Sequence, residues 1–111
     1  MHLTKSHDSM LIEYNSDKEE RFYSCFNSLT KKHGEDMARK IIQRISQLDA
    51  APNPLCLPNS ARFHEHKGKR KGLFSVDLIH PFRLIVLPTC SFSIFNEISS
   101  LKIYEVFNSH K

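Results

Sequence analysis

The chain has 111 residues, of which 40% are hydrophobic and 25% are charged, and its formal net charge is +4. This length corresponds to one domain, and this composition excludes a disordered or low-complexity chain. Its apolar runs are shorter than the roughly 18 residues of a membrane helix, and residues 1–8 lack the apolar centre of a secretion signal. We therefore expect a flexible N-terminus over residues 1–9, a single cytoplasmic domain over residues 10–111, and no membrane contact.

The first half of the chain predicts a strand followed by a helix. Residues 10–15 alternate between apolar and polar side chains, as in a short strand. Ser16 and Glu19 have the spacing of a capping box, which predicts that a helix begins there and continues until Gly34 interrupts it. The apolar residues in between follow helical spacing: Phe22, Phe26 and Leu29.

A second helix is expected over residues 35–50, because two acids suit its first turn and Pro52 prevents its continuation. Its apolar stripe consists of Met37, Ala38, Ile41, Ile42, Ile45 and Leu48. The polar residues predicted to face away from this stripe are Arg39, Lys40, Gln43, Arg44 and Gln47. The two helices should form an antiparallel hairpin.

Beyond the proline-rich connector the pattern changes to the twofold period of strands. Strands are expected over residues 61–66, 73–79, 82–87 and 98–107, whereas the pattern of residues 89–96 predicts no particular conformation. Helices followed by strands indicate an α+β fold, in which the N-terminal strand and the helix hairpin pack on a small, mainly antiparallel twisted sheet.

The positive charge is concentrated in residues 62–72. Five basic side chains and one acid, Glu65, lie in this segment, whereas the rest of the chain has equal numbers of the two signs. The basic residues are Arg62, Lys67, Lys69, Arg70 and Lys71. A basic loop on a neutral body predicts contact with a polyphosphate such as a nucleic acid, and a solvated surface turn is the alternative.

Three cysteines, Cys25, Cys56 and Cys90, are too far apart for a Cys-x-x-C zinc or redox motif. An odd number of cysteines in such a short chain is typical of reduced thiols. We expect Cys25 to lie on the apolar face of a helix, and we assign no chemistry to any of the three.

Residues 64–72 read His-Glu-His-Lys-Gly-Lys-Arg-Lys-Gly, which resembles the His-Glu-x-Lys-Gly-x-Arg-Lys-Gly motif of HigB-type killer toxins in the RelE/ParE superfamily. Three further segments resemble the same group in the same order: residues 33–41, 76–85 and 105–110. The resemblance implies a RelE/ParE-like fold and the toxin of a type II toxin–antitoxin module. Such a toxin is a ribosome-dependent messenger-RNA endonuclease that uses no cofactor or metal and is neutralised by a HigA-type antitoxin with a helix-turn-helix domain.

The resemblance also assigns roles to individual residues. His64 and His110 correspond to the motif and C-terminal histidines, and both titrate near neutral pH, as general acid–base catalysis requires. Lys67 corresponds to the motif lysine, which would neutralise the scissile phosphate or protonate the leaving oxygen. Arg83 corresponds to the strand arginine, which would bind the phosphate through its guanidinium, and the alternative is an ion pair with Asp77.

The remaining basic residues of the loop are assigned to RNA and ribosome contact: Arg62, Lys69, Arg70 and Lys71. For His64, Lys67 and His110 the alternative is a solvated side chain without a catalytic role. Where relatives commonly have Asp-Tyr before the final histidine, this chain has Asn108 and Ser109, which we retain as substrate-contact candidates.

Because asparagine cannot ionise and serine cannot stack on a base, the Asn108–Ser109 pair leaves a catalytically weakened relic that mainly binds antitoxin as an alternative. A ParE-like inhibitor of DNA gyrase is a further alternative, against which the retained motif residues argue. A metal site built on His64 and His66 with His80 or His110 lacks a recognised ligand spacing.

Overall fold

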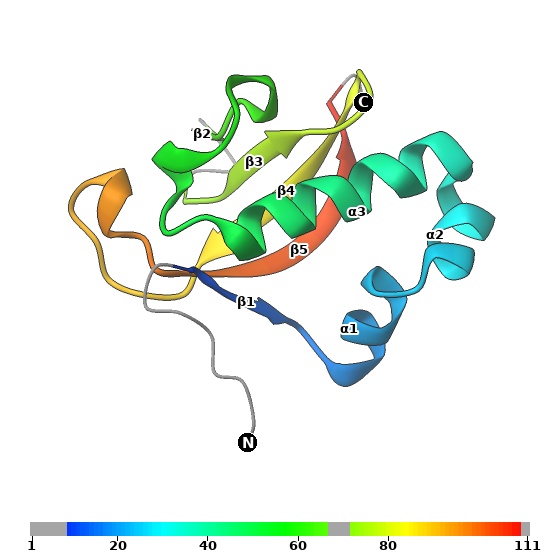
Figure 1. The fold of residues 1–111 in the computed structure, drawn as a ribbon, viewed down its shortest axis with the longest axis horizontal. Coiled ribbons are helices and arrows are strands. Elements are labelled where there is room, and N and C mark those ends of the chain that lie inside the picture. The colour runs from blue at the N-terminus through cyan, green and yellow to red at the C-terminus, as the bar shows by residue number, and fades with distance from the viewer. Residues whose placement is uncertain (1–8, 67–71, 110–111) are drawn as a thin grey trace.

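The computed structural model describes residues 9–66 and 72–109. These residues form an α+β fold, as the sequence predicts, with a sheet whose order is β1-β5-β4-β3-β2 (Figure 1). The strands are β1 (Leu11–Tyr14), β2 (His64–Glu65), β3 (Phe74–Asp77), β4 (Phe82–Pro88) and β5 (Ser100–Asn108). The helices are α1 (Asp17–Tyr23), α2 (Phe26–His33) and α3 (Glu35–Ala50), with short 3-10 turns η1 (Pro54–Cys56), η2 (Asn59–Ala61) and η4 (Phe95–Glu97).

The sheet is mixed. β1 pairs in parallel with β5, whereas the other three neighbouring pairs are antiparallel. The register of β4 against β5 shifts between Ile85 and Val86, and this bulge lets Tyr104 protrude with 43% of its surface exposed. The strand expected over residues 61–66 is wrong in extent, because η2 occupies its start and only His64 and Glu65 pair with β3.

The single helix expected between Ser16 and Gly34 is wrong, because the chain forms two helices there. α1 ends at Tyr23, and the hydroxyl of its C-cap residue Ser24 donates to the carbonyl of Glu20 at 2.7 Å. Cys25 is extended and accepts a hydrogen bond from the amide of Ser28, so it caps α2 instead of lying on a helix face. Ser16 caps α1 through the amide of Glu19, as its sequence pattern predicts.

The hydrophobic core lies between the sheet and α3, which crosses one face of the sheet, with α1 and α2 at one end (Figure 1). The apolar stripe of α3 packs against the core, as predicted. Arg44 is a correction to the sequence analysis: it was placed on the polar side of the helix, but only 4% of its surface is exposed. The opposite face of the sheet carries the candidate site.

Strand register defines which side chains share that opposite face. Leu84 and Val86 belong to the core, so Arg83 and Ile85 point to the other side of β4. The cross-strand partners on the same side complete a set that we call the open face: His64, Ser75, Asp77, Arg83, Ile85, Glu105 and Phe107. Strands from distant parts of the sequence thus bring His64 and Arg83 together.

Candidate functional site

The imidazole of His64 is held at both of its nitrogens. Nδ1 lies 2.6 Å from the backbone carbonyl oxygen of Arg62, and Nε2 lies 2.7 Å from Nη1 of Arg83. A guanidinium only donates hydrogen bonds, so Nε2 must accept the bond from Arg83. Nδ1 must then carry the proton and donate it to the carbonyl. The geometry therefore fixes His64 as a neutral ring with an electron pair on Nε2.

Arg62 supplies the carbonyl that orients this ring. Its backbone is in the left-handed region, with φ 48° and ψ 59°, at the end of η2. A residue with a Cβ rarely adopts this conformation, which costs about 1 kcal/mol or more. The strain is located at the peptide that accepts the hydrogen bond from His64, next to the candidate catalytic group.

A single carboxylate lies between the two arginines of the site. Arg62 Nη1 is 3.5 Å from Asp77 Oδ2, and Arg83 Nε is 4.0 Å from Asp77 Oδ1. The ion pair of Arg83 with Asp77, the alternative raised by the sequence, is therefore present together with the shorter bond to His64. Arg83 is only 26% exposed at its side chain, whereas that of Arg62 is 65% exposed and open to a ligand.

Ser75 is a site residue that the sequence analysis missed. It belongs to the open face, but its own side chain is fully buried, and its Oγ lies 3.4 Å from Nε2 of His64. The only signal in the sequence is the alternation of β3, in which Val76 faces the core and its neighbour Ser75 therefore faces the other side of the sheet.

Aromatic rings extend the site along the open face. The ring of His66 stacks on that of His64 with 5.7 Å between centroids, and it meets Phe107 edge-on at 6.3 Å. Sequence analysis assigned no role to His66 or Phe107. The His64-x-His66 spacing carried the available signal, because residues two apart on a strand share a face.

Asn108 and Ser109, the two substrate-contact candidates, lie at the end of β5. Asn108 pairs with Phe82, one position away from the Phe107–Arg83 pair, and this register puts it on the opposite face from Arg83. Ser109 donates two hydrogen bonds to the carbonyl of Pro81, from its amide at 3.0 Å and from its hydroxyl at 2.7 Å. Its hydroxyl thus ties the end of β5 to the turn between β3 and β4.

Five of the predicted site residues lie outside the described residues: Lys67, Lys69, Arg70, Lys71 and His110. Their assigned roles remain predictions. Within the described part of the chain, the structure brings together His64 and Arg83 of the predicted catalytic set, with Arg62 of the predicted RNA-binding set beside them.

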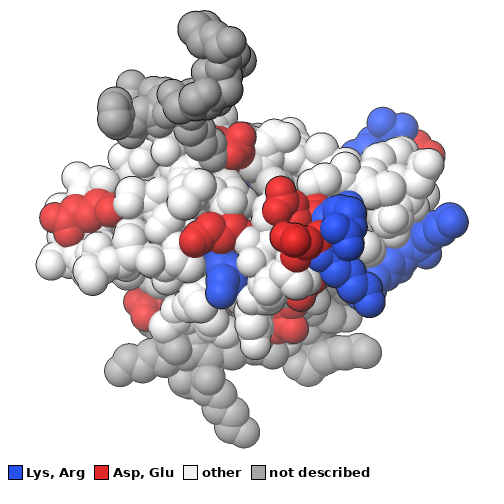
Figure 2. Space-filling view, turned by 90° about the horizontal axis from the view of Figure 1, so that it is seen from below, with Lys and Arg blue, Asp and Glu red and all other residues white. Residues whose placement is uncertain are grey.

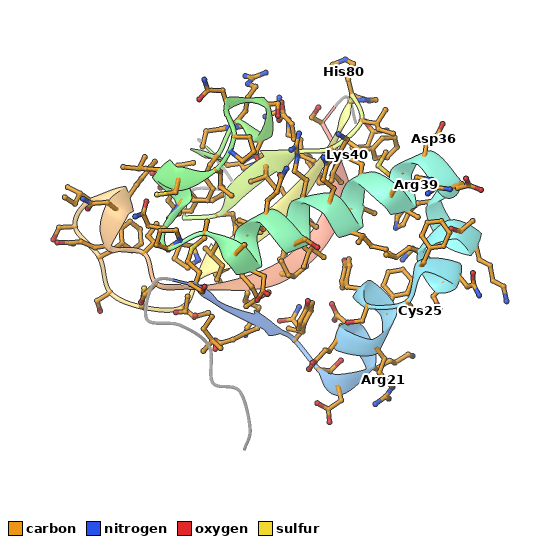
Figure 3. The ribbon with its side chains drawn as sticks, viewed as in Figure 1. Arg21, Cys25, Asp36, Arg39, Lys40 and His80 are labelled. Atoms are coloured by element: carbon orange, nitrogen blue, oxygen red, sulfur yellow. The ribbon has the colours of Figure 1, made fainter. Side chains whose placement is uncertain are left out.

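Other polar features of the surface lie outside this set of residues. Figure 3 shows His80 at the turn between β3 and β4 and Cys25 at the junction of α1 and α2. Lys and Arg side chains gather at the α1–α2 end of the molecule in Figure 2, with acids among them. Over residues 9–66 and 72–109, no three His, Cys, Asp or Glu side chains are grouped as they would be around a metal ion.

A pocket of about 540 Å³ opens between α1, α2 and β5. Its lining includes Phe22, Tyr23, His33, Tyr104 and Glu105. Burial lowers the pKa of His33 below its ordinary value, and the ammonium of Lys32 lowers it further. Neither His64 nor Arg83 reaches this pocket.

Comparison of the chain with models of protein families, with curated proteins and with solved structures gives no match. None of the helices in the described residues is both long enough and apolar enough to cross a membrane.

Proposed function

We propose that the protein is a metal-independent endoribonuclease, the toxin of a type II toxin–antitoxin module with a RelE/ParE-like fold of the HigB type. The observation that carries the proposal is the contact between Nε2 of His64 and the guanidinium of Arg83 on the open face. A neutral imidazole next to a cation is the pair that a phosphodiester cleavage by the neighbouring 2′-hydroxyl needs.

In this mechanism Arg83 releases Nε2 of His64 and binds the scissile phosphate instead. Nε2 of His64 is then free to take the proton of the 2′-hydroxyl, whose oxygen attacks the phosphorus. The bond to the 5′ oxygen breaks, and that oxygen takes a proton from Lys67 or His110. Arg83 and Arg62 stabilise the negative charge that develops on the phosphate oxygens.

The surroundings of this pair suit RNA. Splayed bases stack on aromatic rings, and the ring of His66 lies beside His64, with Phe107 in turn beside His66. The basic residues 67–71 follow His66 directly in the sequence and would add phosphate contacts. The proposed partners are the ribosome, messenger RNA and a HigA-type antitoxin, whose complex with the toxin binds operator DNA through the antitoxin.

The test is induction of the chain in a bacterium without its antitoxin, with new 5′ ends mapped on messenger RNA. We expect growth arrest and translation-dependent 5′ ends, both abolished by the double substitution His64→Ala, Lys67→Ala. His80→Ala is the matched control for the loss of an exposed imidazole. Growth arrest without cleavage would refute the nuclease and favour a ParE-like gyrase inhibitor.

A relic that only binds antitoxin is a second candidate, and the engagement of Ser109 with Pro81 favours it. Neither arrest nor cleavage, together with stable co-purification of the antitoxin, would support this function. The double substitution Asn108→Asp, Ser109→Tyr should then restore cleavage if the loss of the family's Asp-Tyr pair is its cause. Continued inactivity of that variant would exclude this cause.

A further inference from the structure

Arg44 is a buried cation on the face of the sheet opposite the site. It lies on α3 with 4% of its surface exposed, and it donates three hydrogen bonds. Nε donates to the carbonyl of Asp77 at 2.7 Å, Nη2 to the carbonyl of Ser60 at 3.0 Å, and Nη1 to the side chain of Gln47 at 2.9 Å. Burial of a charged group is costly unless such partners compensate it.

The two carbonyls belong to the two segments that build the site. Ser60 lies in η2, two residues before Arg62, whose carbonyl orients the ring of His64. Asp77 ends β3, and its carboxylate lies near both Arg62 and Arg83. Because β2 and β3 pair over only two residues each, Arg44 provides a second link between these segments.

This link requires the shape of a guanidinium. Its planar fork points donors at three acceptors at once, whereas the ammonium of a lysine is a compact charge on a flexible stem. Burial lowers the pKa of Arg44, and the charge of Asp77 opposes that shift. The group remains charged, because the pKa of an arginine is ordinarily far above neutral pH.

We infer that Arg44 is a positioning residue: from the helix-covered face it fixes η2 against β3, and so keeps His64 in its Nδ1-protonated form with Nε2 facing Arg83. The importance of that form for catalysis rests on the proposed nuclease function. The orientation of the His64 ring is independent of that proposed function, so it is measured separately.

The experiment records nitrogen-15 correlation spectra of the histidine rings in the full chain at roughly pH 8.5, where an ordinary imidazole is neutral. The His64 signals are assigned by their loss in His64→Gln. In the wild type we expect the proton on Nδ1. In Arg44→Lys we expect the Nδ1-protonated population to fall at least twofold, because the carbonyl of Arg62 moves away from the ring.

The control is Ile41→Ala, a core substitution on the same helix that lowers stability without touching the link. It should leave the His64 signals unchanged. An unchanged ring in a folded Arg44→Lys protein would overturn the inference. If that variant does not fold, Arg44→Met takes its place, because it removes both donors to the carbonyls of Ser60 and Asp77 together with the buried charge, and a ring unchanged there overturns the inference equally.

Cleavage of messenger RNA on the ribosome gives a second measurement. We expect kcat of Arg44→Lys to fall at least tenfold with little change in KM, while Ile41→Ala keeps its kcat. If the wild type cleaves no RNA, the proposed function fails, but the nitrogen-15 result on Arg44 still stands or falls by itself.

Discussion

The bond that Arg83 donates to Nε2 means that the electron pair of His64 is occupied in this structure. A ligand that draws the guanidinium away makes this electron pair available. A phosphate does so most effectively, because it accepts two parallel hydrogen bonds from the planar fork of an arginine. In the proposed mechanism, Arg83 thus both binds the phosphate and activates His64 as the base.

This dual role predicts that Arg83→Lys is strongly impaired although it keeps the charge. A lysine holds a phosphate as a point charge and cannot offer the same fork, so we expect ribosome-dependent cleavage to fall by about 10² to 10³. The measurement is the single-turnover cleavage rate on programmed ribosomes. Arg39→Lys, on the exposed side of α3, is the matched control, and equal rates for the two variants would contradict this role of Arg83.

At the scale of elements, the break between α1 and α2 depends on Cys25, which caps the start of α2 and does not continue α1. The thiol of Cys25 accepts a hydrogen bond from the amide of Ser28 at 3.4 Å. Hydrogen bonding from Ser28, first through its side chain and then through its amide, lowers the pKa of the thiol. A hydroxyl is a better cap than a thiol in the same place. The junction should therefore tolerate serine and not alanine.

We predict that Cys25→Ser keeps or raises the thermal unfolding midpoint, while Cys25→Ala lowers it by a few degrees because α2 loses its cap. Differential scanning calorimetry on both variants measures this. Cys56→Ala serves as the control for loss of a thiol, since Cys56 is exposed in η1. A Cys25→Ala protein as stable as Cys25→Ser would show that the cap contributes nothing.

The end of α2 predicts a pH dependence of stability. Burial, and then the charge of Lys32, lowers the pKa of His33 in the folded protein, so the unfolded chain binds the proton more readily. The contribution of His33 to stability is therefore present above the ordinary imidazole pKa of about 6.5 and is lost as the pH falls through that region.

The variant His33→Gln should remove this loss. We expect urea midpoints of wild type and variant to approach each other on going from roughly pH 8 to pH 5, because only the wild type must protonate a partly buried ring. His80→Gln, at an exposed position, should leave the pH dependence unchanged. A constant difference between wild type and His33→Gln would contradict the lowered pKa.

At the scale of the whole molecule, the sequence predicted what depends on local pattern. The stripe of α3 and the alternation of β3 and β4 were predicted because burial on one face leaves a periodic signature. The place of Arg44 was not, because its acceptors are carbonyls 16 and 33 residues away in the chain.

The site was predictable to a similar degree. Motif resemblance named His64 and Arg83, and the structure shows that they touch. The contact of Ser75 with His64 and the ring of Phe107 beside His66 arise from cross-strand register, which a single sequence does not encode locally.

The distribution of charge over the molecule predicts how RNA binding depends on salt. Substituting Lys69, Arg70 and Lys71 by alanine should weaken binding and reduce the slope of log affinity against log salt by about 2, since about 0.7 counterions are released per single-strand phosphate contact. Fluorescence anisotropy with a labelled RNA at several salt concentrations measures this slope. The control is the triple alanine variant of Lys18 on α1 and Lys31 and Lys32 on α2, which should keep the wild-type slope.

The parallel pairing of β1 with β5 has a consequence for the synthesis of the chain. β5 lies between β1 and β4, yet it is the last strand to be translated. A nascent chain that lacks residues 100–108 has its first strand and its β3–β4 hairpin but nothing to join them into one sheet. The described sheet can therefore close only after residues 100–108 have been synthesised, later than the four strands that β5 joins into one sheet.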